Sequence, residues 1–225
     1  SFASIPVVAV DIPSRLPSDS GAPAGESLQA RITVTFTAAN VGQVFPPNCE
    51  RVGELVIASI GTPPEVYEQR ADLFLNLITA VQLAPFTRPR ERAAHKGHFG
   101  HVLVVAGARG KTGAAAMAGE AALKIGAGLV TVATAESALP VVAGFVPALM
   151  TEPLAETEVG SISARALEYD RFQQIAENKD VVAIGPGLGT HPDTAAFARR
   201  VVRELRVPAV LDADALNAFA GEPEL

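Results

Sequence analysis

Short apolar runs separated by helix-like stretches are the feature that most constrains the fold of this 225-residue chain. In the second half the runs are nearly continuous in valine, isoleucine and leucine, which is typical of strands buried on both faces of a sheet. The expected strands there are Val102–Ala106, Leu129–Ala133, Val181–Ile184 and Ala209–Leu211. The expected helices there are Gly113–Ile125, Ser163–Glu177 and Ala195–Leu205. Strands that alternate with helices predict an α/β fold with a mostly parallel sheet.

The first half follows a different pattern. Its expected strands are Val7–Val10, Ile32–Phe36 and Leu55–Ile60. The segment between the last two holds consecutive prolines and no helical period, so we expect a loop, and a short helix-like stretch begins at Pro63-Pro64. The basic, proline-containing segment Phe86–His95 marks a boundary near residue 85. We therefore expect two α/β domains, residues 1–85 and residues 86–225.

Charge and hydropathy exclude several classes of protein. Eighteen basic against 24 acidic residues give a net charge of -6, which argues against a nucleic-acid-binding surface. No apolar run approaches the roughly 20 residues that span a bilayer, and the start lacks the basic segment of a secretory signal. The single cysteine, Cys49, cannot form an internal disulfide, and inert packing is favoured over a reactive thiol. A cytoplasmic protein without membrane or nucleic-acid partners fits best.

Both ends of the sequence are abrupt. It opens almost directly on an apolar strand and closes shortly after another strand and the start of a helix. A parallel sheet that stopped there would leave an apolar edge exposed. We therefore expect the chain to be the middle of a longer protein.

Two polar constellations lie next to expected strands. Asp11 directly follows a strand, at the carboxyl edge where open α/β sheets place their ligands. From spacing alone, a cap on a turn forced by Pro13 is favoured over a ligand contact. His95, Lys96 and His98 precede the next domain's first strand. No cysteine or carboxylate stands near them at a metal-ligand spacing, so Lys96 as a phosphate contact, or as a surface residue, is favoured over a metal site.

Three further loops follow strands of the second half. Gly107–Ala114 leads into the alanine-rich helix, and its glycines and helix-start amides favour binding of an anion. The loop is not a P-loop, because its lysine precedes Thr112 and Gly113. Tight helix packing through small residues is the alternative, and both can hold together. Gly185–Thr190 and Leu211–Asn217 end two more strands. With Asp11, four strand ends are expected to converge on one crevice that takes a nucleotide or phosphorylated small molecule.

Within these stretches the sequence closely resembles a known family. HKGHFGHVLVVAG, KTGAAAMAGEAALKIGAGLVTVA, VVAIGPGLG and VLDADALN, in this order, resemble the ADP- or ATP-dependent NAD(P)H-hydrate dehydratases of the ribokinase-like superfamily. VVAVDIPSRLPSDSG, ITVTF and GELVIASIG resemble the end of the NAD(P)H-hydrate epimerase domain. In many bacteria the two domains are fused. The resemblance covers nearly the whole chain, and implies an epimerase-like end over residues 1–85 and the start of a dehydratase-like domain over residues 86–225.

The resemblance implies repair of hydrated nicotinamide cofactors. The epimerase interconverts the two epimers of the hydrated ring of NADHX or NADPHX. The dehydratase phosphorylates the S epimer, usually from ADP in bacteria, and eliminates phosphate to restore NADH or NADPH. The implied cofactors are ADP or ATP, potassium in the epimerase site and Mg²⁺, and the implied assembly is a homo-oligomer.

Site residues follow from the resemblance position by position. Asp11 matches the catalytic aspartate that contacts the hydrated ring, and Ser14 matches a residue near the potassium ion. Arg15 stands where the family usually has glycine, which leaves epimerase activity open. The implied residues of the dehydratase crevice are the substrate-contacting Ala114 and Gly187, with Gly185, Gly189, Asp214 and Asn217 lining it.

Parts of both implied sites are missing. The epimerase's asparagine- and glycine-rich phosphate loop does not occur here, nor do the dehydratase's histidine-proline-glycine segment and its closing loop with the catalytic aspartate. We therefore expect the chain alone to be inactive. A small-molecule kinase of the same superfamily and a non-catalytic nucleotide-binding protein are the alternatives. The choice between ADP and ATP, and between NADHX and NADPHX, is left open.

Overall fold

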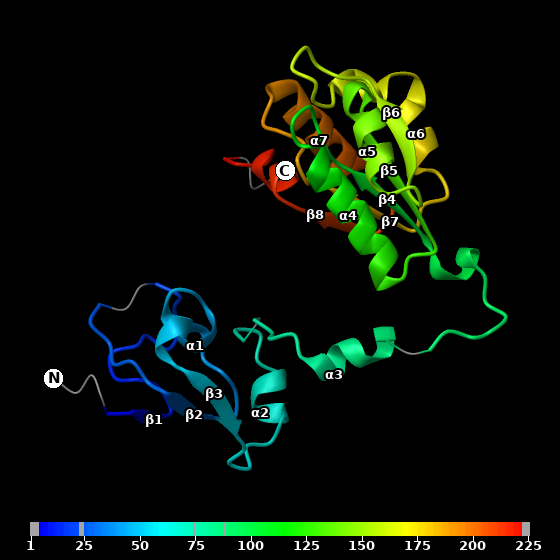
Figure 1. Ribbon diagram of the computed structural model, residues 1–225. Helices are drawn as coiled ribbons and strands as arrows, with labels where there is room; N and C mark the ends of the chain where they lie inside the picture. The colour runs from blue at the N-terminus through cyan, green and yellow to red at the C-terminus, as the bar shows by residue number, and fades with distance from the viewer. Residues whose placement is uncertain (1–4, 23–24, 74, 88, 222–225) are drawn as a thin grey trace. The chain divides into compact units, whose positions relative to one another are not determined.

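The computed structural model describes residues 5–22, 25–73, 75–87 and 89–221 (Figure 1). The chain divides into two units, unit 1 (Ser1–Thr87) and unit 2 (Arg88–Leu225). Over the described ranges, no helix combines the length and the apolar character that a bilayer-spanning segment needs.

Unit 1 is built on three parallel strands in the order β1-β2-β3. The strands are β1 (Val8–Val10), β2 (Ile32–Phe36) and β3 (Glu54–Ala58). The short helical segments of the unit are α1 (Val41–Val44), η1 (Asn48–Arg51), α2 (Glu65–Glu68), α3 (Ala80–Leu83) and η2 (Ala84–Thr87). The strand prediction Ile32–Phe36 is confirmed, and the other two are confirmed with shifts of one or two residues at their ends.

The expectation of a plain loop between β2 and β3 was wrong, because that segment holds α1 and η1. The backbone N–H of Asn40 donates to Oε1 of Gln43 over 2.8 Å, and Gln43 is buried. This reciprocal cap begins a helix of a single turn. One turn is too short to show a hydrophobic period in the sequence.

Unit 2 is a five-stranded, wholly parallel sheet in the order β6-β5-β4-β7-β8. Its strands are β4 (His101–Val105), β5 (Leu129–Ala135), β6 (Met150–Leu154), β7 (Val181–Ile184) and β8 (Ala209–Leu211). Its helical segments are η3 (Lys96–Phe99), α4 (Thr112–Ile125), η4 (Glu136–Ala138), α5 (Leu139–Phe145), η5 (Ala164–Asp170), α6 (Arg171–Ala176), α7 (Pro192–Glu204) and α8 (Asp214–Asn217). The predicted α/β class with parallel sheets is therefore confirmed.

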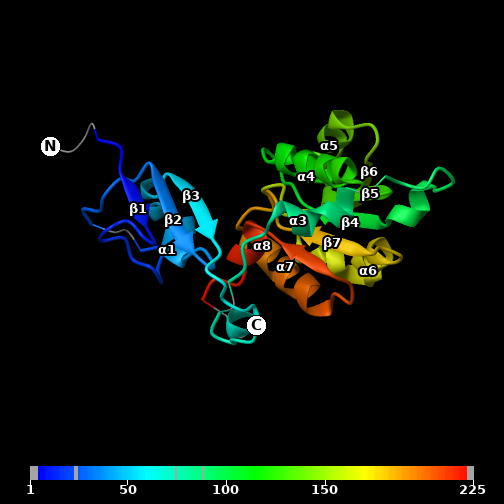
Figure 2. The ribbon, with the colours of Figure 1, turned by 90° about the horizontal axis from the view of Figure 1, so that it is seen from below.

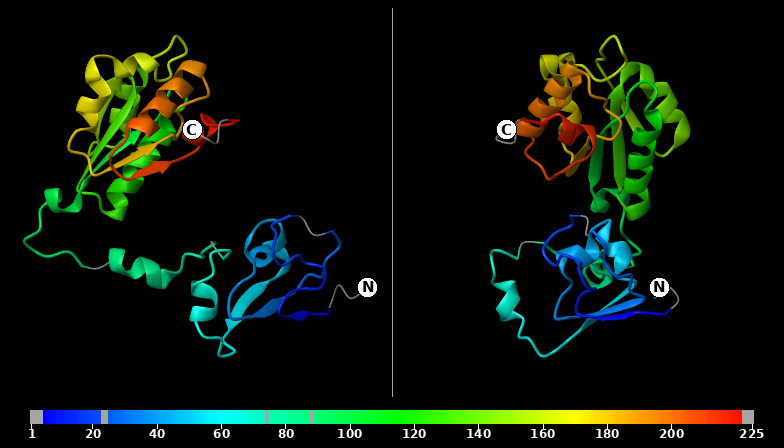
Figure 3. Two further views of the ribbon diagram at one scale, coloured as in Figure 1. Left: turned by 180° about the vertical axis from the view of Figure 1, so that it is seen from behind. Right: turned by 90° about the vertical axis from the view of Figure 1, so that its left-hand side faces the viewer.

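Helices cover both faces of this sheet (Figure 1, Figure 2 and Figure 3). On one face, Val104 and Val132 pack with Ala115 of α4 and Val142 of α5. The core of the other face joins strand residues to α6 and α7, with Phe197 of α7 fully buried. Because the central strands have helices on both sides, successive residues are buried or half-buried whichever face they point to, and this explains their continuous apolar sequence.

Two predictions for unit 2 need correction. The single helix expected over Ser163–Glu177 is split into η5 and α6, because Tyr169 and Asp170 both take φ +55° and interrupt the helix. The strand β6 and the helix α5 were not predicted. β6 forms one edge of the sheet and contains Glu152 and Pro153, so it lacks the apolar run by which buried strands are recognised.

Candidate functional site

Three of the four predicted strand ends meet at one edge of the unit 2 sheet. β4, β7 and β8 are neighbours in the sheet and run parallel, so the loops that follow them lie side by side. Asp11 follows β1, which belongs to the separate sheet of unit 1. Asp11 therefore does not share the sheet edge that carries the other three strand ends. The sequence of an apolar run does not reveal which sheet the strand joins.

The loop after β7 packs against the start of α4. Gly187 has φ +65°, and a Cβ added there would lie 2.9 Å from the Cβ of Ala114 and 2.9 Å from the carbonyl oxygen of Lys111. The N–H of Gly107 also donates to the carbonyl of Pro186 over 2.9 Å. The structure thus brings the predicted Ala114 and Gly187 into direct contact, with the loop after β4 beside them.

The same loop also approaches the turn after β8. Gly185 has φ +133°, and a Cβ added there would overlap the carbonyl oxygen of Asp212 and lie 3.1 Å from the Cβ of Ala215. Only glycine leaves room for this approach of two backbones. Gly185 therefore fixes the spacing between two of the three loops.

Asp214 connects the three loops through its carboxylate. Its Oδ2 accepts a 2.7 Å hydrogen bond from the N–H of Gly189, and its Oδ1 accepts one of 3.2 Å from Nδ2 of Asn217. Nζ of Lys111 lies 3.7 Å from Oδ2, with 15% of the Asp214 side chain and 49% of the Lys111 side chain exposed. Gly189, Asp214 and Asn217 are thus brought together as predicted. Lys111 was not among the predicted site residues, and its place just before a helix in a glycine-rich loop was the available signal.

The backbone directly before Asp214 is strained. Ala213 takes φ 44° and ψ -108°, outside the regions that residues with a Cβ ordinarily occupy. Such a conformation costs about 1–3 kcal/mol and persists only where surrounding contacts impose it. The strain and the two hydrogen bonds together orient the Asp214 carboxylate.

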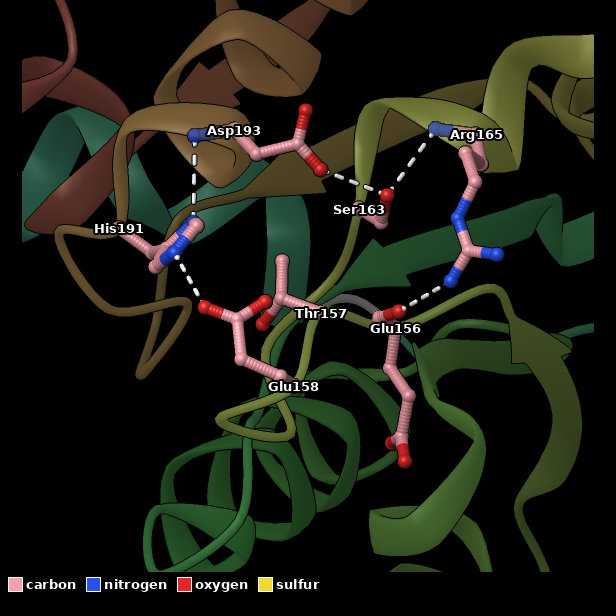
Figure 4. Close-up of a pocket in the computed structure, with 7 residues that line it drawn as sticks. All are labelled: Glu156, Thr157, Glu158, Ser163, Arg165, His191 and Asp193. Carbon is pink, nitrogen blue, oxygen red and sulfur yellow. Dashed lines mark hydrogen bonds and ion pairs between the residues drawn. The ribbon is translucent and has the colours of Figure 1, made fainter.

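A cavity of about 730 Å³ lies between the β6–η5 loop and the start of α7 (Figure 4). Its lining residues are Glu156, Thr157, Glu158, Ser163, Arg165, His191 and Asp193. None of them is a predicted site residue. The cavity is nevertheless near the predicted loops, because a Cβ at Gly189 would lie 3.9 Å from the Cβ of Ser161.

The polar groups of this cavity mostly bind one another. Oδ2 of Asp193 accepts a 2.6 Å hydrogen bond from the hydroxyl of Ser163. Nδ1 of His191 accepts from the N–H of Asp193, and Nε2 lies 3.1 Å from Oε1 of Glu158 (Figure 4). With Nδ1 accepting from the N–H of Asp193, Nε2 is the ring nitrogen that donates to Glu158.

Hydrogen bonds lower the pKa of two carboxylates of this cavity. Hydrogen bonding from Ser137 lowers the pKa of Glu156, with a smaller contribution from Arg109. The backbone N–H of Glu158 itself, followed by His191, lowers the pKa of Glu158. The cavity is therefore lined by satisfied acceptors.

The Asp11 turn lies in unit 1. Oδ1 of Asp11 accepts from the hydroxyl of Thr35 over 3.1 Å, and its carbonyl accepts from Nε2 of Gln43 over 2.6 Å. Ser14 is exposed on the same turn. Arg15 takes φ +70°, so the turn keeps the left-handed conformation that glycine would favour.

The histidine-rich segment lies at the end of the unit 2 sheet where the strands begin, whereas the crevice lies at the end where they finish. Lys96 and His98 belong to η3, which precedes β4, whereas the crevice loops follow the strands. Nδ1 of His95 accepts from the N–H of Gly97 over 3.2 Å. Lys96 thus cannot contact a ligand in the crevice from this position. Throughout the part of the chain that the structure describes, no three His, Cys, Asp or Glu side chains gather as a metal-binding group.

Comparisons with known proteins agree with the order of the sequence motifs. Residues 102–225 match a family model described as NAD(P)H-hydrate dehydratase, and residues 2–42 match one described as YjeF-related protein N-terminus. A bifunctional NAD(P)H-hydrate repair enzyme of Moorella thermoacetica is 41% identical over 95% of this chain and 40% of its own length. The enzyme of the same description from Salinibacter ruber is 37% identical over 96% of this chain and 40% of its own. The chain thus spans about 40% of these curated relatives.

A solved structure aligns with about two thirds of the chain. A hypothetical protein of Streptococcus mutans has a TM-score of 0.54 and 28% sequence identity, over 67% of this chain and 51% of its own. The α/β fold is therefore shared with a protein of known structure.

Proposed function

The chain belongs to the NAD(P)H-hydrate dehydratase family, and we propose that the crevice of unit 2 binds the hydrated nicotinamide cofactor in nucleotide-dependent dehydration of (S)-NADHX or (S)-NADPHX. The observation that carries the proposal is that the family match, residues 102–225, contains all three neighbouring strand ends and the Asp214 cluster. The bifunctional relatives support the same substrate class.

ADP or ATP, when bound, supplies the phosphoryl group that turns the ring hydroxyl into a phosphate leaving group. The chain's own residues bind and orient the ring. Gly187 and Ala114 are partly exposed and carry no bulky side chain, so the hydrated ring can approach the backbone there. The Asp214 carboxylate, held by Gly189 and Asn217, is placed to accept a hydrogen bond from a ligand hydroxyl.

Mg²⁺ and potassium are proposed only because the family resemblance implies them. The described residues gather no group of three His, Cys, Asp or Glu side chains, so Mg²⁺ would need oxygen ligands from the phosphates of the nucleotide. Ser14 is exposed beside Asp11 and is proposed as a potassium contact. A cytoplasmic homo-oligomer is likewise proposed on the resemblance.

For unit 1 we propose the end of an epimerase-like domain over residues 1–85, ahead of a dehydratase-like domain over residues 86–225. The match of residues 2–42 to the YjeF-related model supports this assignment. Asp11 would act on the hydrated ring, since its second oxygen is left for a ligand when Oδ1 accepts from Thr35. In the full-length protein, Asp11→Asn should slow epimerisation of hydrated NADH, whereas Asp19→Asn, on an exposed part of the same unit, should not.

The dehydratase proposal is tested with the full-length protein, (S)-hydrated NADH and either ADP or ATP. We expect the absorbance of the reduced nicotinamide ring to return, with one phosphate released for each NADH formed. Nucleotide consumption with a vitamin-type alcohol, and none with hydrated NADH, would favour the kinase alternative. Binding without turnover would favour the non-catalytic one.

A matched pair of variants places the reaction at one edge of the sheet. Asp214→Asn changes the carboxylate of the crevice. Asp180→Asn changes a carboxylate at the other end of the strands, where Oδ2 of Asp180 accepts a 2.7 Å hydrogen bond from the N–H of His101. We expect Asp214→Asn to lower kcat/KM at least tenfold, which is the effect of losing one charge-assisted hydrogen bond to the substrate. Asp180→Asn should leave kcat/KM within about threefold of the wild-type value. Equal effects of the two variants would contradict a site at the crevice.

A further inference from the structure

Lys111 has two separate relations to the crevice. Its backbone and Cβ pack against the loop after β7, since a Cβ at Gly187 would lie 2.9 Å from its carbonyl oxygen and 3.1 Å from its Cβ. Its Nζ lies 3.8 Å from the position of a Cβ at Gly189 and 3.7 Å from Oδ2 of Asp214. The packing of the Lys111 backbone against Gly187 therefore keeps the ammonium group of Lys111 at the crevice.

The ammonium group is not needed to satisfy Asp214. The two oxygens of that carboxylate already accept hydrogen bonds from Gly189 and Asn217. At 3.7 Å the ammonium is close enough for attraction but too far for a hydrogen bond. None of its three N–H donors is donated to an acceptor within the described ranges, and half of the side chain is exposed.

A second cation strengthens the positive character of the same loop. Arg109, two residues earlier, is 62% exposed, and its Nη2 lies 3.8 Å from Oε1 of Glu156, again beyond hydrogen-bond distance. Two loosely paired cations stand on one short loop of a chain with net charge -6. Such a loop attracts an anionic group of a ligand, and an ammonium with free donors binds phosphate oxygens well.

We propose that Lys111 binds the diphosphate of the hydrated dinucleotide and so makes the crevice prefer the whole dinucleotide over its uncharged riboside. The proposal rests on the proposed function and adds to it a residue that decides between substrates. The nicotinamide end would then lie at Ala114 and Gly187, which pack beside the backbone of Lys111. The adenine nucleotide donor also carries a diphosphate, so the experiment distinguishes the two sources.

The test compares Lys111→Met and Lys111→Arg in the full-length protein, with two substrates. One is (S)-hydrated NADH, and the other is the hydrated reduced nicotinamide riboside, which has no phosphate. Methionine keeps the Cβ and the backbone that pack against Gly187, so the fold should be preserved. Lys124→Met is the matched control, because Lys124 lies at the far end of α4, 2.8 Å from Glu120, with 74% of its side chain exposed.

We expect Lys111→Met to raise the KM for hydrated NADH about tenfold with kcat changed less than about twofold, as for loss of a hydrogen bond to a charged group. The KM for the riboside and for ADP or ATP should stay within about twofold, and Lys111→Arg should recover most of the loss. An equal rise for both substrates, a rise confined to the nucleotide donor, or no rise at all would overturn the proposal.

A wild-type protein that dehydrates neither substrate would refute the proposed function but still leave this inference testable. Equilibrium binding of NADH and of the reduced riboside to the same variants then replaces kinetics. Weaker binding of NADH alone to Lys111→Met would support the proposal. Unchanged binding of NADH would overturn it.

Discussion

The contact between Gly187 and Ala114 gives a quantitative test of how the crevice is built. In Gly187→Ala, the new residue must keep φ +65°, which costs a residue with a Cβ roughly 1–2 kcal/mol. The new Cβ would also lie 2.9 Å from the Ala114 Cβ and from the carbonyl oxygen of Lys111, and relieving such overpacking costs about 1–3 kcal/mol. We therefore expect unit 2 to lose about 2–5 kcal/mol of stability.

A second substitution separates the two contributions. Ala114→Gly alone should cost about 1 kcal/mol in the first turn of α4. In the double variant it also removes one of the two close contacts, so the double variant should be more stable than the sum of the single effects predicts, by about 1 kcal/mol. The contact with Lys111 and the positive φ remain, so recovery should be partial.

Native-state hydrogen exchange of amides in β4 and β7 is the suitable assay. It reports the opening free energy of unit 2 alone, whereas circular dichroism would sum the unfolding of both units. A loss below about 0.5 kcal/mol in Gly187→Ala, or strictly additive effects in the cycle, would refute the reasoning. The loop after β7 would then not be packed on α4 in solution.

Three further predictions concern single positions. Burial and the nearby Lys179 lower the pKa of His101, so its neutral form is favoured in the fold. Unit 2 should keep this stability above the ordinary pKa of about 6.5 and lose it as the pH falls from there through the lower pKa of the folded state, a dependence that urea titrations should find weaker in His101→Gln. Phe197→Ala should destabilise unit 2 by about 3–5 kcal/mol by the same exchange assay, because this fully buried ring stacks edge-on with Phe172 at 5.7 Å. Because Arg15 holds φ +70°, Arg15→Val should destabilise unit 1 by at least about 1 kcal/mol. Arg15→Gly should leave the stability of unit 1 within about 0.5 kcal/mol, and hydrogen exchange of the amides in β2 measures both effects.

The central strands of unit 2 could be predicted because burial on both faces forces a continuous apolar sequence. The central strand Val181–Ile184 is confirmed residue for residue. Ala209–Leu211 is confirmed with the same bounds, although β8 is an edge strand and its first two residues are exposed. The edge strand β6 could not be predicted in this way, since one side of it carries no neighbouring strand and tolerates Glu152 and Pro153. The break between η5 and α6 depends on left-handed conformations at Tyr169 and Asp170, which their residue types do not require.

The candidate site was predictable in its parts but not in its assembly. Glycines at 185, 187 and 189 mark a turn that approaches other backbone closely, and the contacts of that turn agree with this. Which loops it approaches depends on the sheet order β4-β7-β8, whereas β5 and β6 intervene in the sequence. Lys111 was missed because its role follows from the distance to Asp214, a residue about a hundred positions away.

Asp11 and Asp214 belong to different sheets, which bears on how the two proposed activities relate. The described hydrogen-bond partners of the Asp11 side chain and carbonyl, Thr35 and Gln43, belong to unit 1, and those of Asp214 belong to unit 2. Each carboxylate is therefore oriented by its own sheet and by short-range contacts, which act over a few ångströms. An epimerase and a dehydratase built this way would be linked by the substrate rather than by shared side chains, because the product of the first is the S epimer that the second consumes. A substitution at one carboxylate should then change the supply or the consumption of that epimer without changing the geometry at the other.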